Sequence, residues 1–217
     1  MTDPLPITPR TRLRRAPQRG AFDRATVYAI LDAMPLCHVG YVLEGSPVVM
    51  PTIQWREGDH VYWHGSAAGR GLKAAVEQEV CLTVSLLDSF VLARSAMHHS
   101  VDYRSAMIFG RPLKIQDPDE KAAKLKCLIE SLYPGRWDLL RPMTEQEVKA
   151  TAILSMPIEE ASAKIRQRGV VDDEADYARP IWAGVVPVRM QVLEPQADPR
   201  NQQGINRPDH ASSVELG

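Results

Sequence analysis

The chain has 217 residues, a formal net charge of −1 and a charged fraction of 24%, so we expect one domain with terminal extensions. This balanced charge gives no overall field that would attract nucleic acid or a membrane surface, and no apolar run is long enough to span a bilayer. The arginine-rich start lacks the apolar core of a signal peptide, so we expect a cytoplasmic protein.

Residues 1–20 contain four prolines and five arginines and have almost no side chains to bury. We interpret them as an extended basic arm, which could lie on a partner subunit. Because no aromatic residues are interleaved with the arginines, nucleic-acid binding is the less favoured interpretation.

A first helix is predicted over residues 23–34, with Asp23 as its N-cap and Pro35 as its stop. Its apolar stripe consists of Val27, Ile30, Leu31 and Met34. From Leu36 the apolar period changes to two, which predicts a hairpin of strands 37–43 and 47–55 around a turn at 44–46.

The remaining elements are mostly short strands with few helices between them. Residues 80–86 alternate between apolar and small polar side chains, which predicts a strand with two different faces. Further strands are expected at 60–64, 90–93, 103–115, 153–156, 161–165 and 181–193, and helices at 67–76, 117–133 and 145–150. This pattern predicts a mainly β antiparallel barrel with helical caps over residues 21–194, followed by a mobile polar tail at 195–217.

The three cysteines, Cys37, Cys81 and Cys127, are widely spaced and lie in apolar segments. We interpret them as small core residues, because neither a disulfide framework nor a zinc site fits this number and spacing.

The segment His60–Val76 reads as a strand, a turn of small residues and a helix. Ser66 is the expected N-cap, and Gly65 and Gly69 would let the backbone approach an anion such as phosphate or carboxylate. Arg70 and Lys73 would add positive charge on one face. An ordinary capped helix with solvated cations explains the same residues, and the glycine spacing matches neither a Walker loop nor a dinucleotide fingerprint.

Other reactive side chains lie outside this segment. His98, His99 and Tyr103 could transfer protons or bind a ligand, or simply lie at the surface; no acidic or cysteine partner falls at metal-ligand spacing, so no metal site is expected. Lys164 and Arg166 could hold an acidic ligand, or could pair with the carboxylates at 172–174.

Trp182 could stack on a planar ring or pack in the core. The sequence contains no nucleophile elbow, no HExxH motif and no Ser-His-Asp spacing, so a bound cofactor would have to supply the chemistry.

Taken together, several segments resemble the flavin-nucleotide-binding branch of the pyridoxamine 5′-phosphate oxidase-like split-barrel family, to which relatives of the nitroimidazole resistance reductases belong. With the helix at 23–34, these segments are CHVGYV, VVMPTIQW, VYWHGSAAGR, VCLTVSLLDS, VLARSAMHHSVDYRSAMIFGR and IWAGVVPV. The resemblance covers about residues 19–194. It implies a six-stranded antiparallel split β-barrel that forms a homodimer with two FMN molecules at the subunit interface.

Positions that match the family motifs imply a set of flavin-binding residues. Met50, Pro51, Thr52, Ile53 and Gln54 would run along the edge of the isoalloxazine ring. The ribityl phosphate would be held by His64, Gly65, Ser66, Gly69 and Arg70, with Lys73 in place of the family's usual lysine. Ser105 and Trp182 match positions close to the ring.

The chain also departs from the family pattern. Gln54 stands where a lysine often ends the flavin-edge strand, and no basic signature for pyridoxal phosphate follows Trp182, which argues against pyridoxamine phosphate oxidase activity. Haem-binding members of this fold exist, and His98 or His99 is compatible with haem.

The sequence therefore predicts an FMN-binding oxidoreductase that uses a reduced nicotinamide to reduce a small organic acceptor, with His98, His99 or Tyr103 as a proton donor. The alternative is a non-catalytic flavin- or haem-binding protein that acts as a sensor or carrier.

Overall fold

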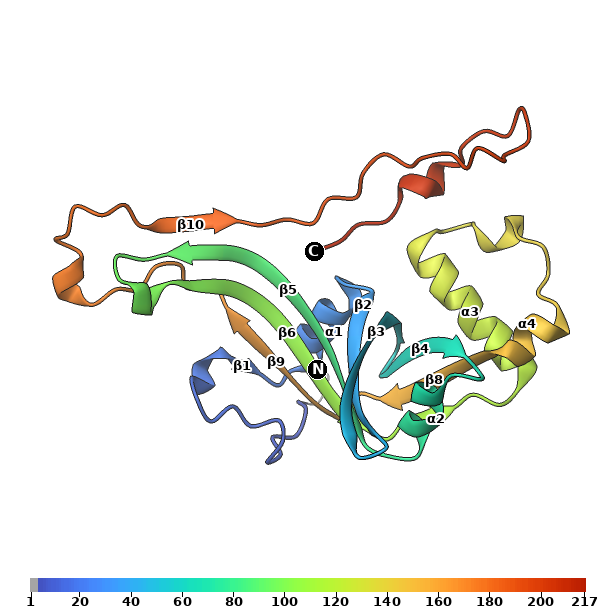
Figure 1. Ribbon diagram of the computed structural model, residues 1–217, viewed down its shortest axis with the longest axis horizontal. Helices are drawn as coiled ribbons and strands as arrows, with labels where there is room; N and C mark the ends of the chain where they lie inside the picture. Colours follow the sequence, from blue (N-terminus) through green and yellow to red (C-terminus); the bar gives the residue numbers. More distant parts are fainter. Residues whose placement is uncertain (1–3) are drawn as a thin grey trace.

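The computed structural model describes residues 4–217, so Met1–Asp3 of the predicted arm lie outside the described part (Figure 1). Within that part, the α-helices are α1 (Arg24–Asp32), α2 (Arg70–Val76), α3 (Pro118–Leu132) and α4 (Glu145–Ala150). The strands are β1 (Gly20–Ala21), β2 (Leu36–Leu43), β3 (Ser46–Glu57), β4 (His60–Ser66), β5 (Val80–Leu92), β6 (Ser100–Gly110), β7 (Leu113–Lys114), β8 (Thr151–Pro157), β9 (Glu160–Arg166) and β10 (Gly184–Pro187).

All ten strands belong to one antiparallel sheet, which confirms the predicted mainly β fold. The strand order is β1-β9-β6-β5-β2-β3-β4-β8-β7, and β10 pairs with the far end of β5. The count of six strands implied by the family resemblance is not reproduced. The sheet is split at β3, because residues 46–53 pair with β2 whereas residues 54–57 pair with β4.

The hydrophobic core fills the inside of the strongly curved sheet and is closed by α1 and α2. The predicted alternation in β5 is confirmed, because Val80, Leu82, Val84 and Leu86 all point into this core. Trp63 of β4 is fully buried there, and α3 covers a smaller apolar cluster on the other side of β4. Cys37 is a buried core residue as predicted, Cys81 and Cys127 are partly buried, and all three are free thiols.

The helix caps follow the sequence closely. The Asp23 carboxylate accepts a hydrogen bond from the Thr26 amide (2.8 Å), and Asp117 caps α3 in the same way through the Glu120 amide (2.8 Å). Two left-handed residues, Glu44 and Gly45, form the tight turn between β2 and β3. Among the described residues, no helix is both long and apolar enough to cross a membrane.

Several predicted boundaries are wrong. Residues 90–93 are not a separate strand, because β5 continues through an irregularity between Leu87 and Ser89. The predicted strand 103–115 is divided into β6 and β7, and only residues 184–187 of the predicted strand 181–193 pair with a neighbour. Short β1 was not predicted, because its two residues form a strand only by pairing with β9.

The basic arm packs against its own chain, contrary to the expectation that it buries almost nothing. Leu5 and Thr11 are buried, and the Leu5 amide donates to the Phe22 carbonyl oxygen (2.7 Å). Arg10 lies between the carboxylates of Glu79 and Glu160. The arm is therefore anchored by the burial of Leu5 in the main core and by the ion pairs of Arg10.

The polar tail runs across the molecule and returns to it (Figure 1). The Gly217 amide donates to the Ala33 carbonyl oxygen (3.0 Å), and the Ser213 hydroxyl donates to the Leu132 carbonyl oxygen (3.0 Å). These contacts place the end of the chain beside α1 and α3; the mobility of the tail stays a prediction.

Candidate functional site

Residues 64–73 are here called the phosphate loop; they comprise the end of β4, the turn that follows it and the first turn of α2. Its geometry differs from the prediction, because α2 begins at Arg70 and its N-cap is Gly69, with no side-chain cap. The predicted cap at Ser66 is wrong. The Ser66 hydroxyl accepts a long hydrogen bond from the Ala68 amide (3.3 Å), and the Ser66 carbonyl oxygen accepts one from the Gly69 amide (2.9 Å), which closes a turn before the helix.

Positive charge projects freely from this loop. Arg70 is 76% exposed, and its only ion pair in the described part of the chain is with Glu44, equally exposed, at 3.4 Å. A pair so exposed contributes little energy, so the guanidinium is available to another anion. Lys73 is exposed on the next turn. The two cations that the sequence assigned to a phosphate therefore do face solvent.

A close approach fixes α2 against the sheet. A Cβ atom on Gly71 would lie 2.3 Å from the hydroxyl of Tyr41 in β2, and 3.7 Å from the sulfur of Met50 in β3. Only glycine fits at this position without movement of the tyrosine. This contact joins the phosphate loop to the part of β3 that pairs with β2, residues 46–53, which contains four of the five predicted flavin-edge residues.

His64 lies at the entrance of the phosphate loop. Its Nδ1 atom is buried and has no hydrogen-bond partner among the described residues, and burial lowers the pKa of the imidazole. The ring is therefore neutral at pH 7. The Thr52 hydroxyl makes a long hydrogen bond to the His64 carbonyl oxygen (3.4 Å) across the split between β3 and β4. An unpaired buried nitrogen beside an opening in the sheet is typical of a ligand site.

The predicted flavin-edge residues do not all face the same way. Val49, Pro51 and Ile53 point outward from β3, whereas Met50 packs against the core. Gln54 is 2% exposed, and its amide donates to the carbonyl oxygens of Leu31 (2.7 Å) and Met34 (2.9 Å) at the end of α1. Gln54 is therefore buried against the end of α1 and does not face an open surface, as a flavin-edge residue would.

The other predicted site residues lie elsewhere in the same subunit. Trp182 is 70% exposed and precedes β10, and His98 and His99 follow the same end of β5. The phosphate loop lies beside the opposite end of β5, and thirteen residues of strand at about 3.3 Å each separate these ends by about 40 Å. Figure 1 shows α2 and β10 at opposite ends of the sheet.

Tyr103 and Ser105 occupy the middle of β6 between these two ends. Both are half-buried, and the Ser105 hydroxyl makes a long hydrogen bond to the Lys164 carbonyl oxygen (3.4 Å). The predicted site residues lie too far apart in one subunit to contact the same ligand. They can do so only if two subunits pair, so that the end of the sheet near Trp182 in one subunit lies beside the phosphate loop of its partner.

The outer face of the sheet carries an unusual number of apolar side chains. Strand pairing places them on a single face, which consists of Leu36, Val42, Val49, Ile53, Leu87 and Met107. Each is at least 37% exposed, and Val49 reaches 66%. An apolar face of this kind is typical of a protein–protein interface.

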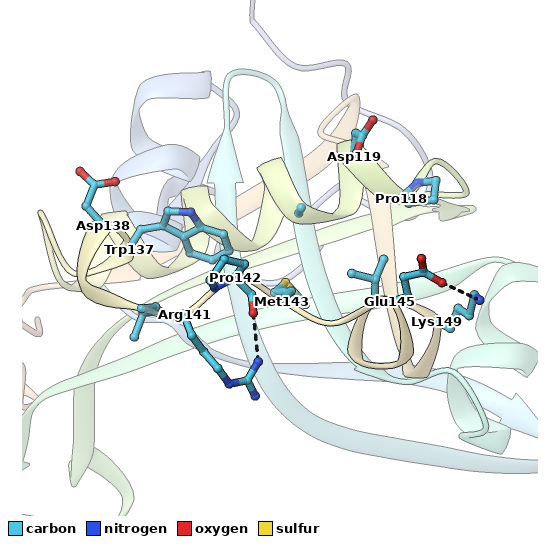
Figure 2. A pocket seen from close by; sticks show the side chains of 12 residues that line it. Pro118, Asp119, Trp137, Asp138, Arg141, Pro142, Met143, Glu145 and Lys149 are labelled. Carbon is cyan, nitrogen blue, oxygen red and sulfur yellow. Dashed lines mark hydrogen bonds and ion pairs between the residues drawn. The ribbon is translucent and has the colours of Figure 1, made fainter. Parts of the chain in front are cut away.

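A cavity of about 720 Å³ lies away from all of these residues, between α3, α4 and the loop that joins them (Figure 2). Trp137 and Met143 contribute apolar lining, and several of the charged side chains at its rim form ion pairs. Lys149 lies 3.4 Å from Glu145, and Arg141 pairs with Glu147. The cavity contains none of the side chains that the sequence assigned to a ligand.

Comparison with known proteins identifies the family. A sequence model described as pyridoxamine 5′-phosphate oxidase matches residues 23–165. The chain belongs to the pyridoxamine 5′-phosphate oxidase family. The family resemblance seen in the sequence is therefore confirmed. A search of curated proteins finds no match.

Two solved structures are similar to this family member over nearly its whole length. The flavocytochrome Anf3 from Azotobacter vinelandii is 50% identical with a TM-score of 0.94, and the match covers 97% of this chain and 98% of that one. The FAD and heme binding protein from Mycobacterium smegmatis is 33% identical with a TM-score of 0.86, and the match covers 91% and 98%.

A third structure shows the fold alone. It is described as a candidate 5-nitroimidazole antibiotic resistance protein from Bacteroides thetaiotaomicron and is 23% identical, with a TM-score of 0.57. The match covers 67% of this chain and 86% of that one. In the sequence, the motifs resemble those of relatives of the nitroimidazole resistance reductases, and a solved structure described as such a resistance protein has a similar fold.

Sequence reasoning missed some contacts around these residues. The partner of Arg70 is Glu44 from the β2–β3 turn, and the neighbours of His98 are acidic residues from positions 172–176, more than 70 positions away. No local spacing signals either contact. Arg166 does not pair with the carboxylates at 172–174, because it pairs with Asp102 inside the sheet.

Proposed function

We propose that this family member is a redox protein that binds a flavin and a haem, with the flavin phosphate at the phosphate loop. The observation that carries the proposal is the 50% identity, over 97% of the chain, to a flavocytochrome. The free charges of Arg70 and Lys73 and the unpaired Nδ1 of His64 support it. The chemistry that a bound flavin supplies is hydride acceptance from a reduced nicotinamide and electron release to a small acceptor.

The flavin is FMN by the family resemblance, with FAD as the alternative that the relative from M. smegmatis suggests. In either cofactor a phosphate follows the ribityl chain, so the roles proposed for Arg70 and Lys73 are the same. Thr52 and His64 lie at the split in the sheet where the ring would enter. Backbone groups of β3 would position the ring edge, and the neutral imidazole of His64 would accept or donate a hydrogen bond.

The complete site is proposed to need two subunits. The outer apolar face of the sheet is the surface that a second copy would cover, burying Leu36, Val49 and Met107 among others. Such a homodimer would bring Trp182, His98 or His99 of one copy toward the phosphate loop of the other. This arrangement removes the separation of about 40 Å within one chain.

The haem requires an axial nitrogen with a free lone pair. His99 offers one, because its Nδ1 contacts the Ser95 carbonyl oxygen (2.9 Å) and its Nε2 has no partner among the described residues. His98 is the less suitable neighbour, because carboxylates surround its ring. His99 is therefore our proposed haem ligand of the adjacent pair.

The purified protein is the direct test of this proposal. We expect a homodimer by light scattering, a Soret band, and flavin absorption at about one flavin per chain. Chromatography of the released flavin separates FMN from FAD. Anaerobic addition of NADH or NADPH should bleach the flavin bands. A colourless protein that binds neither added flavin nor haem would exclude the proposal.

The same purified protein distinguishes the proposed redox protein from a second candidate function, a non-catalytic flavin or haem carrier. This candidate is favoured by the distance between the predicted proton donors and the phosphate loop within one chain. Flavin that stays oxidised in stopped-flow mixing with both nicotinamides, and that passes no electrons to added acceptors once chemically reduced, would identify a carrier.

Arg70→Ala should weaken FMN binding about 10- to 100-fold and leave riboflavin binding almost unchanged, because the guanidinium is proposed to contact only the phosphate. Fluorescence titration of the apoprotein with each ligand measures both constants. Arg111→Ala is the control, since Arg111 is an exposed arginine outside the phosphate loop. Equal losses for FMN and riboflavin would show that Arg70 acts through the structure of the loop.

A further inference from the structure

The connection between β5 and β6 packs against residues 172–177, a segment that precedes β10. At the centre of this contact lies Asp172, whose side chain is fully buried. Both of its carboxylate oxygens accept hydrogen bonds from the Arg94 amide (3.2 Å each), and the Arg94 guanidinium donates a third (3.0 Å). The Arg94 guanidinium thus pairs directly with the buried carboxylate.

The imidazole of His98 lies directly against this buried carboxylate. Its Nδ1 is 3.5 Å from Asp172 Oδ1 and has no closer hydrogen-bond partner within the described residues. The other ring nitrogen, Nε2, faces outward and is 3.9 Å from a carboxylate oxygen of Asp173. The fixed charge of Asp172 therefore favours the tautomer with a proton on Nδ1, which leaves the lone pair of Nε2 free.

The carboxylate of Asp176 also lies close to His98 and Asp173. One nitrogen of His98 and one carboxylate oxygen each of Asp173 and Asp176 lie within 4.8 Å of one another. Asp176 is largely buried and receives a hydrogen bond from Arg179 on Oδ1 (2.6 Å), which leaves Oδ2 available. Asp173 is 81% exposed, so its side chain is free to rotate by the small amount that convergence requires.

We propose that His98, Asp173 and Asp176 form a binding site for a divalent transition metal, of which Zn²⁺ is the best match. One imidazole and two carboxylates are a ligand set that zinc accepts, at bond lengths of about 2.0–2.2 Å, with water in the fourth position. Asp172 is the positioning residue, because a buried carboxylate on Nδ1 orients a metal-binding histidine through its outer nitrogen.

The surroundings favour a small cation over a haem iron at His98. A haem brings four nitrogen ligands of its own and needs a broad apolar slot beside the histidine. The carboxylates of Asp173 and Asp176 occupy the space around the imidazole instead. The site therefore complements the proposed haem at His99 and does not depend on it.

The metal would connect two segments that are distant in sequence. His98 ends the short turn Ala96–His98 between β5 and β6. Asp173 immediately precedes the turn Glu174–Asp176, and Asp176 is its last residue. Binding would fix the start of the chain segment that continues into Trp182 and β10. Because the metal is proposed to bind only the folded protein, it should raise the melting temperature, and this rise should grow with the logarithm of the free metal concentration above the dissociation constant.

The test is titration of the metal-free, cofactor-loaded protein with Zn²⁺ and, as a coloured probe, Co²⁺. We expect one ion per chain by calorimetry and by metal analysis after gel filtration, and visible Co²⁺ bands. Asp173→Asn and His98→Ala should each weaken binding at least 100-fold. Asp172→Asn should weaken it about 10- to 100-fold, as changes in a ligand's supporting residue do.

His60→Ala is the matched control, because it removes an exposed imidazole of β4 that belongs to neither proposed site; it should bind Zn²⁺ like the wild type. Asp173→Asn is the decisive variant, since so exposed a side chain can be changed without unfolding the chain. Stoichiometric binding that survives both His98→Ala and Asp173→Asn would overturn the proposal, as would the absence of binding in the wild type. Loss of the Soret band in His98→Ala with unchanged zinc binding would assign His98 to the haem instead.

Discussion

Asp102→Ala is expected to lower the free energy of unfolding by about 3–5 kcal/mol, because it leaves the buried Arg166 guanidinium without a counter-charge. The Arg166 side chain is 6% exposed and pairs with Asp102 between β6 and β9. Asp102 also accepts hydrogen bonds from the Ser89 hydroxyl (3.1 Å) and from the amides of Arg168 (3.2 Å) and Gly169 (3.3 Å). Thermal and urea unfolding followed by circular dichroism measure the loss.

Asp88→Ala is the matched control on the same hairpin. Asp88 pairs with Arg104 through two donors, at 2.8 and 3.1 Å, but both side chains are about one quarter exposed. An ion pair so open to solvent contributes at most about 1 kcal/mol. Equal losses for Asp102→Ala and Asp88→Ala would contradict the assignment of a special role to the buried pair.

The contribution of Asp102 should depend on pH in a defined direction. Burial opposes its ionisation, but the Arg168 amide, Arg166 and Ser89 outweigh burial and hold its pKa below the ordinary value of about 4. A carboxyl group with a lowered folded-state pKa stabilises fully above the unfolded value and loses this stabilisation as the pH falls toward the folded one. The stability difference between wild type and Asp102→Asn should therefore shrink below about pH 4.

This pair also shows what the sequence could not predict. The alternation of β5 and the caps at Asp23 and Asp117 were predictable, because side-chain period and capping act within a few residues. From the sequence, Arg166 could hold an acidic ligand or pair with the nearby acidic cluster at 172–174, because sequence distance is the only guide to a partner. Its true partner lies 64 positions away, and pairing of β6 with β9 brings the two together.

The candidate site was predictable in its parts but not in its assembly. The sequence places Arg70 and Lys73 in the loop after β4, and both project into solvent, whereas their contact with a phosphate stays a prediction. Helix propensity placed the start of α2 three residues early, because the turn at Ser66 and the packing of Gly71 on Tyr41 decide where the helix begins. The distance between the phosphate loop and Trp182 follows from the length of β5, which the sequence had divided into two strands.

The family motif and the structure give Gln54 different roles: the motif implies a contact with the flavin ring, whereas the structure shows hydrogen bonds to the end of α1. Substitution of Gln54 tests both roles. Gln54→Met keeps a similar volume but removes the amide that donates to the Leu31 and Met34 carbonyl oxygens. We expect the free energy of unfolding to fall by about 1–3 kcal/mol, because the Met34 carbonyl oxygen is left without this donor, whereas the Leu31 carbonyl oxygen still accepts from the Met34 amide (3.4 Å). Thr52→Val is the control on the same strand, since Thr52 makes a single long hydrogen bond (3.4 Å) and should cost less than about 1 kcal/mol.

Flavin affinity distinguishes the two roles of Gln54 directly. If the Gln54 amide only holds the end of α1, the folded Gln54→Met variant should bind FMN and riboflavin as tightly as the wild type. The affinities are measured well below the lowered melting temperature of the variant, so that it stays folded. If Gln54 contacts the ring edge, as the family pattern implies, both ligands should weaken by the same factor because the contact does not involve the phosphate. The structure favours the first outcome, since a side chain that is 2% exposed and already donates two hydrogen bonds has no free donor to offer a ring.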